Sequence, residues 1–551
     1  MLLYNYDYLI ALNDIFGISE NFMKKIFRYK CLKDKKMKLG LFLIFTFVFN
    51  VNSLFVLANN IEIYNVRVTE KNTTANWMNI QFNVRGENFW RTPSDAQNWS
   101  AGWYFVKYRI NDGIWQHATL STNDADHEMP PAIFAEVDAA SDGKGVFIHT
   151  ALLNWSGNYN VSDLNIRWDY GSDGLADNET NIDISLFGIE MVYVPQGSFY
   201  LGSGGGETNT FYEYPNINTP YQINSENSII VNNSAGNLYY TNDDTYSGDR
   251  GTIPAAFPKG YDAFYMMRYE ISQLQYVDFL NTLTRSQQNN RTESDVLVTD
   301  IFNRYVMSNT NSVQHRNGIA CNETGNGTTD PINFYCDLNN NGAGNEIDDG
   351  QNIACGYITT SDGLAYLDWA GLRPMTELEY EKACRGTVYP VANEYAWGTT
   401  NLTQTSLSIT NSGQANEVAS NTGLGLCNYG QDMSGFPYRC GYASTASTSR
   451  EQAGASYYGI LDLTGNIVEK CISIGNPEGR SFIGSHGDGT VDVDGNATNT
   501  DWPLLNSGVS GRGGHAYHTE PYIGVSSRGR GLDNRVFRFF AWGWRGVRTQ
   551  N

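Results

Sequence analysis

Hydrophobic and polar residues alternate with a period of two in several segments between residues 59 and 188. In the first of these, Met78, Ile80, Phe82 and Val84 alternate with polar neighbours. The pattern recurs in later segments, which contain Tyr104, Val106, Tyr108 and Ile110, then Leu164, Ile166, Trp168 and Tyr170, and finally Ile182, Ile184 and Leu186. Gly, Asn and Asp residues separate these segments, as turns between strands require. The pattern predicts an all-β sandwich domain over residues 59–188.

The pattern changes at Gly188, and residues 189–551 combine short patterned segments with long polar insertions. The longest insertions are 203–258, 286–350 and 401–455. Loops of that length are either functional or ordered by something other than a hydrophobic core. Two segments, Gln273–Thr284 and Ser361–Ala370, carry apolar residues at helical spacing and are predicted to be helices. We therefore expect a second, loop-rich domain over residues 189–551.

Residues 1–58 have the features of an export leader. A basic stretch from Lys30 to Lys38 precedes an apolar run from Leu39 to Val51, and Val56 and Ala58 supply the small-residue cleavage site. Met37 is the expected true start. The alternative is a membrane anchor that is not cleaved, but polar residues interrupt the run, and a spanning helix needs ~20 apolar residues. We expect the protein to be secreted or at the cell surface.

The chain is acidic, with 58 Asp and Glu against 37 Lys and Arg and a formal net charge of −21. Because phosphate binding needs clustered cations, nucleic acid is not an expected partner. Scattered carboxylates offer oxygen ligands to calcium. Seven of the eight cysteines lie between residues 321 and 471. Export makes disulfides possible, and a local pair such as Cys427–Cys440 is expected, with at least one thiol left over.

Several segments together resemble the formylglycine-generating enzyme family, also called sulfatase-modifying factors. They follow the family's order from about residue 189 to residue 548. The segments are Met191–Phe199, Tyr265–Ile271 followed by Tyr276 and Phe279, Gly371–Gly386, Tyr395–Gly398, Gly459–Glu469, Arg512–Gly514 and Trp544–Arg548. The resemblance implies an irregular α+β domain related to C-type lectins, low in regular structure.

The same resemblance puts the family's oxidase activity in doubt for this chain. The family's oxidases bind copper through two cysteines that follow a Gly-Gly-Ser motif. Counted from Gly513-Gly514-His515, those positions fall on His518 and Ile523, and no cysteine follows Cys471. A copper(I) site needs soft thiolates. Neither copper nor iron is therefore an expected cofactor.

Two segments are candidate calcium sites. In the family, one loop binds calcium through side chains and backbone carbonyls, and its counterparts here are Asp462, Gly465, Ile467 and Glu469. The second candidate, Asp337–Asp348, has oxygen side chains at the spacing of a twelve-residue calcium loop, with Gly342 at the sharp turn. Its expected ligands are Asp337, Asn339, Asn341, the Ala343 carbonyl, Asn345 and Asp348. An Asn- and Gly-rich linker is the alternative, and Cys336 and Cys355 could staple the loop.

Histidines gather near the C-terminus. His486, His515 and His518 could hold a transition metal together with Glu520 if they converged, and are the only catalytic candidates; the alternative is that they line a cleft. Arginine and aromatic residues follow in the last stretch, and such residues dominate binding hot spots. The expected ligand cleft consists of Arg512, His515, Tyr517, His518, Arg528 and Trp542.

Three functions remain open at this point. The first is a secreted, calcium-stabilised module that binds an extracellular glycan, a peptide or a cell-surface protein. The second is a metal-dependent oxidase or oxygenase acting on protein or small-molecule thiols. The third is a self-assembling structural subunit of a surface layer or filament. Fold resemblance alone does not choose among them, because function depends on the site.

Overall fold

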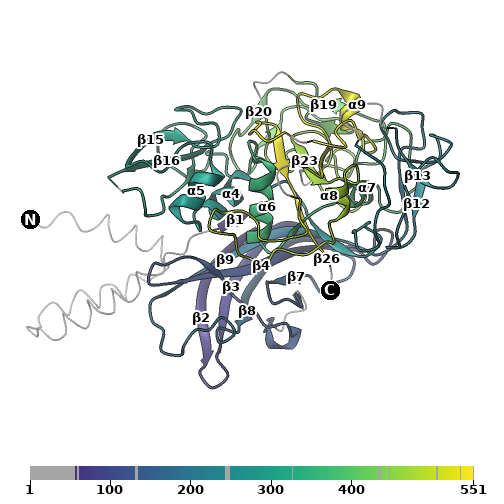
Figure 1. Ribbon diagram of the computed structural model, residues 1–551. Helices are drawn as coiled ribbons and strands as arrows, with labels where there is room; N and C mark the ends of the chain where they lie inside the picture. Colours follow the sequence, from purple (N-terminus) through teal and green to yellow (C-terminus); the bar gives the residue numbers. More distant parts are fainter. Residues whose placement is uncertain are drawn as a thin grey trace, which may run out of the picture. The chain divides into compact units, whose positions relative to one another are not determined.

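The computed structural model describes residues 56–58, 61–130, 135–241, 248–325, 327–431, 436–445, 447–503, 507–533 and 535–549. The expected start at Met37 and the basic and apolar segments of the expected signal peptide lie outside these residues, whereas the expected cleavage-site residues Val56 and Ala58 lie in a short strand, β1 (Val56–Ala58). Among the described residues, no helix combines the length and the apolar character needed to cross a membrane. The chain is rich in strands and loops and has few, short helices (Figure 1).

One large sheet runs through the middle of the molecule. Its strand order is β18-β26-β14-β9-β4-β7-β6, and β5 pairs with β4. A second sheet has the order β1-β2-β3-β8. The strands of the large sheet are β4 (Ser100–Ile110), β5 (Gln116–His117), β6 (Glu136–Ala139), β7 (Val146–His149), β9 (Ile182–Val194), β14 (Phe264–Met267), β18 (Arg373–Pro374) and β26 (Gly546–Thr549). Those of the second are β1 (Val56–Ala58), β2 (Ile61–Asn72), β3 (Trp77–Arg91) and β8 (Trp155–Trp168).

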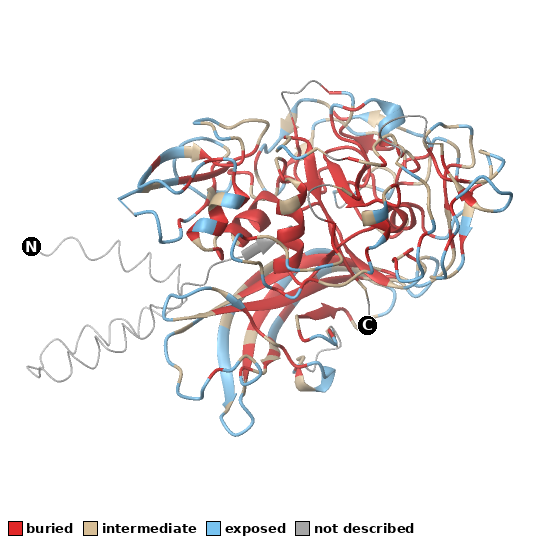
Figure 2. Cartoon of the chain, in the orientation of Figure 1, coloured by how far each residue is buried: buried red, intermediate tan, exposed pale blue. Residues whose placement is uncertain are grey.

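The two sheets share a hydrophobic core. Tyr104, Val106 and Tyr108 of β4 lie in this core with Ile80 and Phe82 of β3. The alternating segments found in the sequence are therefore strands, as predicted. Strand β4 is also buried on its opposite face, where Trp103 and Phe105 belong to a second core. Figure 2 shows the buried residues concentrated along the large sheet and the helices beside it.

The predicted domain boundary at residues 188 and 189 falls inside β9. Strand β9 pairs with β4 along nearly its whole length, from Ile182↔Ile110 to Val192↔Ser100, and its C-terminal end also pairs with β14, from Met191↔Met267 to Val194↔Phe264. Each of these strands is antiparallel to β9, so one continuous ladder joins the two sequence regions. The region 55–551 accordingly forms a single compact unit.

Short helices and small sheets make up the rest of the chain. The helices are η1 (Asp124–Asp126), α4 (Gln273–Leu280), α5 (Arg285–Arg291), α6 (Thr360–Trp369), α7 (Glu377–Arg385), α8 (Pro477–Arg480) and α9 (Glu520–Ile523). The small-sheet strands are β10 (Phe199–Leu201), β11 (Tyr212–Glu213), β12 (Tyr221–Ile223), β13 (Leu238–Tyr239), β15 (Asp300–Tyr305), β16 (Ile319–Thr324), β17 (Tyr335–Cys336), β19 (Thr403–Gln404), β20 (Ile409–Thr410), β21 (Val418–Ala419), β22 (Leu426–Cys427), β23 (Val468–Ile472), β24 (Val509–Arg512) and β25 (Trp542–Trp544). Helices α4 and α6 confirm the two helical predictions.

Capping explains where the main helices begin. Ser272, Thr359 and Thr376 each accept a hydrogen bond from the third helical residue, whose side chain bonds back to the cap. Such capping boxes satisfy two backbone N–H groups that would otherwise lack partners. Helix α7 was missed in the sequence because its buried surface is largely charged, so it lacks the apolar periodicity of an ordinary helix.

The expected disulfides are not formed. All seven described cysteines are buried free thiols. The thiol of Cys427 donates to the Thr464 carbonyl, and that of Cys440 donates to the Glu270 carbonyl. The two sulfur atoms therefore have different partners. Cys336 and Cys355, which could have formed a disulfide bond across the loop, are free thiols as well.

The shared ladder predicts that the C-terminal region cannot fold by itself. A chain limited to residues 189–551 loses β4, and with it Trp103 and Phe105 from the core that the two regions share. We expect it to lack a cooperative thermal transition in circular dichroism, whereas residues 59–551 unfold in one transition. Cooperative unfolding of residues 189–551 near the melting temperature of the longer chain would contradict the single-unit fold.

Candidate functional site

A cavity of about 570 Å³ opens among three segments that lie far apart in the sequence. One wall follows β10 and runs from Ser203 to Thr210. The second follows α7 and includes Asn393, Glu394 and Thr400. The third is formed by α9 and the residues after it, from Glu520 to Gly529. Most of the lining side chains are hydroxyl, amide or carboxyl groups, with Tyr395 and Tyr522 as aromatic members.

Glu207 links two walls of this cavity. Its carboxylate accepts a hydrogen bond of 2.6 Å from the Ser203 hydroxyl and another from the backbone N–H of Asn393. The side chain is therefore held in place from both sides. Tyr522, on the third wall, keeps 47% of its surface exposed. The cavity consequently offers a fixed carboxylate and an accessible aromatic ring.

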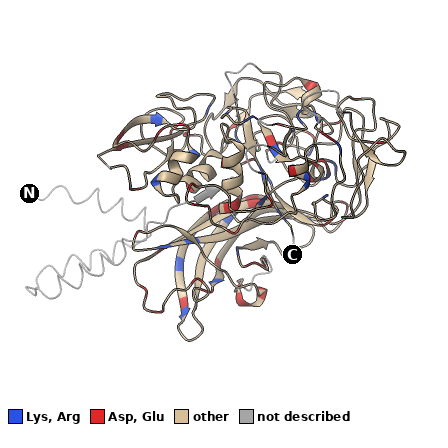
Figure 3. Cartoon of the chain, in the orientation of Figure 1, with Lys and Arg blue, Asp and Glu red and all other residues tan. Residues whose placement is uncertain are grey.

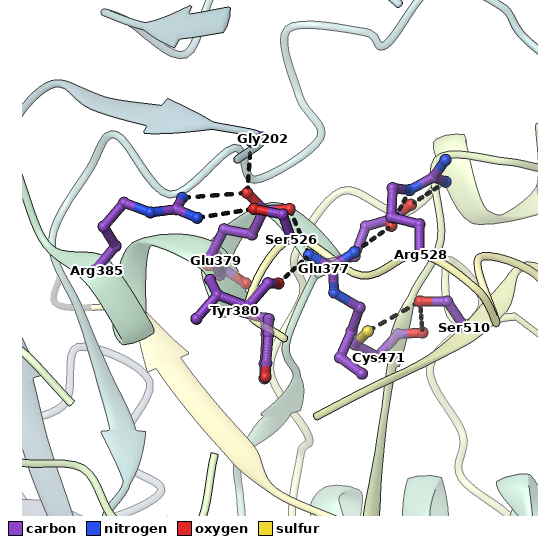
Figure 4. Close-up of polar contacts among 12 residues, drawn as sticks. Gly202, Glu377, Glu379, Tyr380, Arg385, Cys471, Ser510, Ser526 and Arg528 are labelled. Atoms are coloured by element: carbon purple, nitrogen blue, oxygen red, sulfur yellow. Dashed lines mark hydrogen bonds and ion pairs between the residues drawn. The ribbon is translucent and has the colours of Figure 1, made fainter. Parts of the chain in front are cut away.

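A buried ionic network adjoins this cavity through Glu394 and Ser526, which line it. Figure 4 shows the polar contacts of the network around α7. Arg385 of α7 pairs with Glu394 and donates to the Ser526 hydroxyl at 2.9 Å, so it joins two walls. Glu381, one turn earlier, accepts from the backbone N–H of Gly202 at 2.8 Å, next to the first wall. Acidic and basic residues lie side by side along α7 (Figure 3).

Two further arginines extend the network under the site. Arg528 donates to both oxygens of Glu377, at 2.7 and 3.0 Å, and Arg512 pairs with Glu381. The Arg528 guanidinium also lies 4.0 Å from the ring centre of Tyr240. Bidentate and stacked arginines fix planar geometry in a way that lysine cannot. The cavity thus adjoins a buried network in which each of these arginines is ion-paired with a glutamate of α7.

His515 and His518 form a stacked pair beside this cavity. Their ring centres are 3.5 Å apart, and Tyr522 stacks on the other side of His518 at 5.1 Å. Burial lowers the pKa of His518 to about 3 and that of His515 to about 2, and the charges of Arg530 and Arg535 act in the same direction. Both imidazoles are therefore neutral at ordinary pH.

The structure does not bring the predicted histidine cluster together. His486 accepts a hydrogen bond from the Thr549 backbone at the end of β26 and lines a different cavity from His518. Arg530 donates to Nε2 of His518 at 3.0 Å, which occupies one of the two nitrogens that could bind a metal. In the described ranges, only Glu346, Asp348 and Asp349 converge as three ligand atoms.

The predicted cleft residues divide into buried and exposed members. Arg512 and Arg528 lie in the ionic base, and Trp542 is buried between the ammonium of Lys470 and the guanidinium of Arg535. Tyr517 is 52% exposed. Sequence reasoning missed Glu207 and Tyr522, since nothing in their local pattern marks them. The position of Tyr522, immediately before the second cysteine position of the resemblance, was the one available hint.

The family's calcium frame has a buried carboxylate cluster at its centre. Asp462 accepts a hydrogen bond from the Gly441 backbone, and its charge acts on the neighbouring carboxyl group of Glu270. One oxygen of Glu270 is buried and has no conventional donor. Burial raises the pKa of both acids. Paired carboxyl groups of this kind need either a shared proton or a cation.

Glu469 is engaged differently from the other acids of the frame. Both of its oxygens accept hydrogen bonds from the Arg545 guanidinium, which also donates to the carbonyls of Met267 and Leu461. The donor set around Asp462 and Glu270 fits a hard cation such as calcium, because it consists of oxygen atoms and includes one that lacks a donor. Glu469 would have to share its charge between that cation and Arg545.

The second predicted calcium loop is closed by backbone hydrogen bonds. Asp337, at its first position, accepts from the backbone N–H groups of Asn341 and Gly342. The side-chain oxygen of Asn345, an expected ligand, accepts a hydrogen bond of 3.0 Å from the backbone N–H of Cys336. Glu346, the next residue, contributes its carboxylate to the converging acids instead.

The comparisons with known proteins identify the C-terminal region. The family model of the sulfatase-modifying factor enzyme 1-like domain matches residues 187–530, which is more than half of the chain. The match begins within β9 and covers both the 570 Å³ cavity and the Asp462 frame. Among curated proteins, none matches the chain.

The histidine pair predicts a specific pH dependence of folding. In the unfolded chain each imidazole titrates near pH 6.5, whereas in the folded chain it does so only near pH 2 to 3. Below pH 6.5 the unfolded state binds more protons, so the free energy of unfolding falls as the pH falls. Between pH 7 and pH 5 we expect a loss of roughly 1–2 kcal/mol per histidine.

Urea denaturation at the two pH values tests this expectation. His515→Gln and His518→Gln should each lose less stability than the wild type on acidification, since glutamine does not titrate. An equal pH dependence in wild type and both variants would show that the imidazoles are not held neutral by burial.

The Glu469–Arg545 pair predicts a large and local stability effect. Arg545→Met leaves a fully buried carboxylate without its cation, which costs about 3–5 kcal/mol of unfolding free energy. Arg85→Met, which removes an exposed arginine paired with Glu62, should cost about 0–1 kcal/mol. Both are measured by chemical denaturation in calcium-free buffer. Equal effects of the two substitutions would contradict the role given to Arg545.

Proposed function

Because the chain belongs to the sulfatase-modifying factor enzyme 1-like domain family, we propose that it uses this fold as an extracellular ligand-binding module and not as a thiol oxidase. The two positions that carry copper-binding cysteines in the family's oxidases are His518 and Ile523. Ile523 is fully buried and apolar, and His518 is already held by Arg530. Neither position supplies the thiolate that copper(I) prefers.

The 570 Å³ cavity is the observation that carries this proposal. Its volume is within the usual range for small-ligand sites, and its walls converge hydroxyl, amide and carboxylate groups next to an exposed tyrosine. A sugar has matching chemistry: its hydroxyl groups hydrogen-bond to such side chains, and its C–H face stacks on an aromatic ring. Glu207 and Glu520 give the walls negative charge, whereas the charge of Glu394 is balanced by Arg385. We therefore infer a neutral or cationic glycan as the ligand.

Secretion and calcium complete the proposal. The basic and apolar segments before residue 58 support export by a signal peptide. The Asp462 and Glu270 carboxyl groups support one calcium ion in the family frame, where it would neutralise two buried acids next to β23. In this scheme calcium stabilises the loops. The β-sandwich inferred for residues 59–188 is joined to the binding domain through the hydrogen-bonded ladder of β4 and β9.

Ligand binding is tested with the purified chain of residues 59–551 on an array of glycans, with a peptide array in parallel. Tyr522→Ala and Glu207→Gln should each lower the affinity for the bound glycan at least tenfold. Phe302→Ala is the control, because Phe302 is an aromatic residue on β15 that is 65% exposed and does not line the cavity.

Two results would change the proposal. Binding to peptides but not to glycans, with the same loss in Tyr522→Ala, would keep the cavity and replace the ligand class. Oxygen consumption with a cysteine-containing peptide and added copper, without any binding on either array, would contradict the proposal and indicate that the chain is an oxidase.

A further inference from the structure

The loop from Asp337 to Asp349 contains acidic side chains that converge without a basic partner. Glu346, Asp348 and Asp349 each place a carboxylate oxygen within 4.8 Å of the other two. Among the ion pairs of the described residues, none involves any of these three acids. The cluster receives hydrogen bonds only from neutral groups, including the Asn341 amide to Glu346 at 2.5 Å and the Asn339 amide to Asp348 at 3.0 Å.

Asp349 supplies a second observation that does not depend on the clustering. Its side chain is fully buried, and its Oδ1 atom has no hydrogen-bond partner. The other oxygen accepts from the backbone N–H of Glu346 at 2.6 Å, which fixes the orientation of the carboxylate. An unpaired buried carboxylate oxygen carries a desolvation cost that a bound cation removes.

The surrounding loop holds these acids in one place. Both oxygens of Asp337 accept backbone N–H groups within the loop, and the Tyr305 hydroxyl of β15 donates to Asp337 as well. The φ angle of Asn345 is 63°, in the left-handed region, and Glu346 follows this residue. The loop therefore holds the acids in fixed positions. Asp348 is one of the expected ligands, whereas Glu346 and Asp349 each lie one residue after an expected ligand.

We propose that this loop binds one calcium ion through the carboxylates of Glu346, Asp348 and Asp349. Calcium fits because all candidate donors are oxygen atoms, because the ion accepts six to eight ligands in flexible geometry, and because water can complete its shell at the exposed side of Glu346. The amide nitrogens of Asn339 and Asn341 already contact the acids, and their oxygens accept backbone N–H groups of the loop. This proposal does not depend on the ligand-binding function.

Binding at this loop would order more than the loop. The Gly350 backbone donates to the Gly413 carbonyl, which connects the loop to the insertion between β20 and β21. Gln351 donates to the Glu346 carbonyl at 2.6 Å, and its own carbonyl accepts from Leu274 at the start of α4. One ion would thus fix two of the long insertions onto the first predicted helix.

Calorimetric titration of the EDTA-treated chain of residues 59–551 with calcium chloride tests the proposal. The double variant Glu346→Gln, Asp349→Asn should lose one calcium per chain or weaken that site at least tenfold. The variant Asp462→Asn should keep the loop site, which separates it from the family frame. The matched control is Glu70→Gln, Asp112→Asn, which removes two exposed acids far from the loop and should titrate as the wild type.

Two further readouts separate binding from a structural role of the acids. Calcium should slow hydrogen exchange of the amides in residues 337–350 in the wild type and leave it unchanged in the double variant. In EDTA, the double variant should melt at or above the wild-type temperature, because it removes repulsion between like charges. Wild-type calcium stoichiometry and affinity in the double variant, or its lower melting temperature in EDTA, would overturn the proposal.

Discussion

Buried pairing of arginine with glutamate is the interaction on which the C-terminal region depends. A domain with few helices and short strands has little regular backbone hydrogen bonding between its loops, so another force must connect them. Arg545 with Glu469, Arg528 with Glu377 and Arg373 with Glu379 supply that connection, and all six side chains are almost fully buried. Breaking such a pair is costly because the remaining charge stays buried.

Helix α7 is the centre of this network. Three glutamates and an arginine of this one helix each contact a different part of the chain: Glu377 contacts Arg528, Glu379 contacts Arg373, Glu381 contacts Arg512 and Gly202, and Arg385 contacts Glu394 and Ser526. The helix is short and fully buried, so its charged side chains are held in fixed positions and connect the segments around it. The walls of the 570 Å³ cavity come from distant parts of the chain, and they stay in register because each is tied to α7.

The same structure explains how a binding role could follow from an enzyme family. The fold, the frame around Asp462 and the closing Arg545 are independent of the two thiol positions. In the proposed function, His518 and Ile523 stand at the positions of the family's copper-binding cysteines, and neither residue belongs to the ion pairs that α7 makes. What remains is a rigid cavity with an aromatic edge at Tyr522. Both sequence regions contribute strands to the large sheet, and β9 spans the predicted boundary between them.

The sequence alone determined the local elements whose apolar residues recur at a regular spacing. The leucine and valine spacing of α4 and the alternation in β3 are of this kind, because helical and strand periodicity can be recognised from neighbouring residues. The order of the family motifs also fixed the fold family. The twelve-residue spacing located the loop at Asp337, since the turn at Gly342 is a local requirement.

Only the tertiary structure decided how these parts combine. The sequence pattern predicted a boundary at residue 188, but β9 is buried on both faces there, and alternation does not record pairing partners. The sequence pattern did not predict helix α7, because its buried side chains are charged and are paired with arginines from distant segments. In the loop, the carboxylates that converge are Glu346, Asp348 and Asp349, and the cavity is lined by Glu207 and Tyr522. These assignments depend on where distant side chains meet, which residue spacing along one chain does not encode.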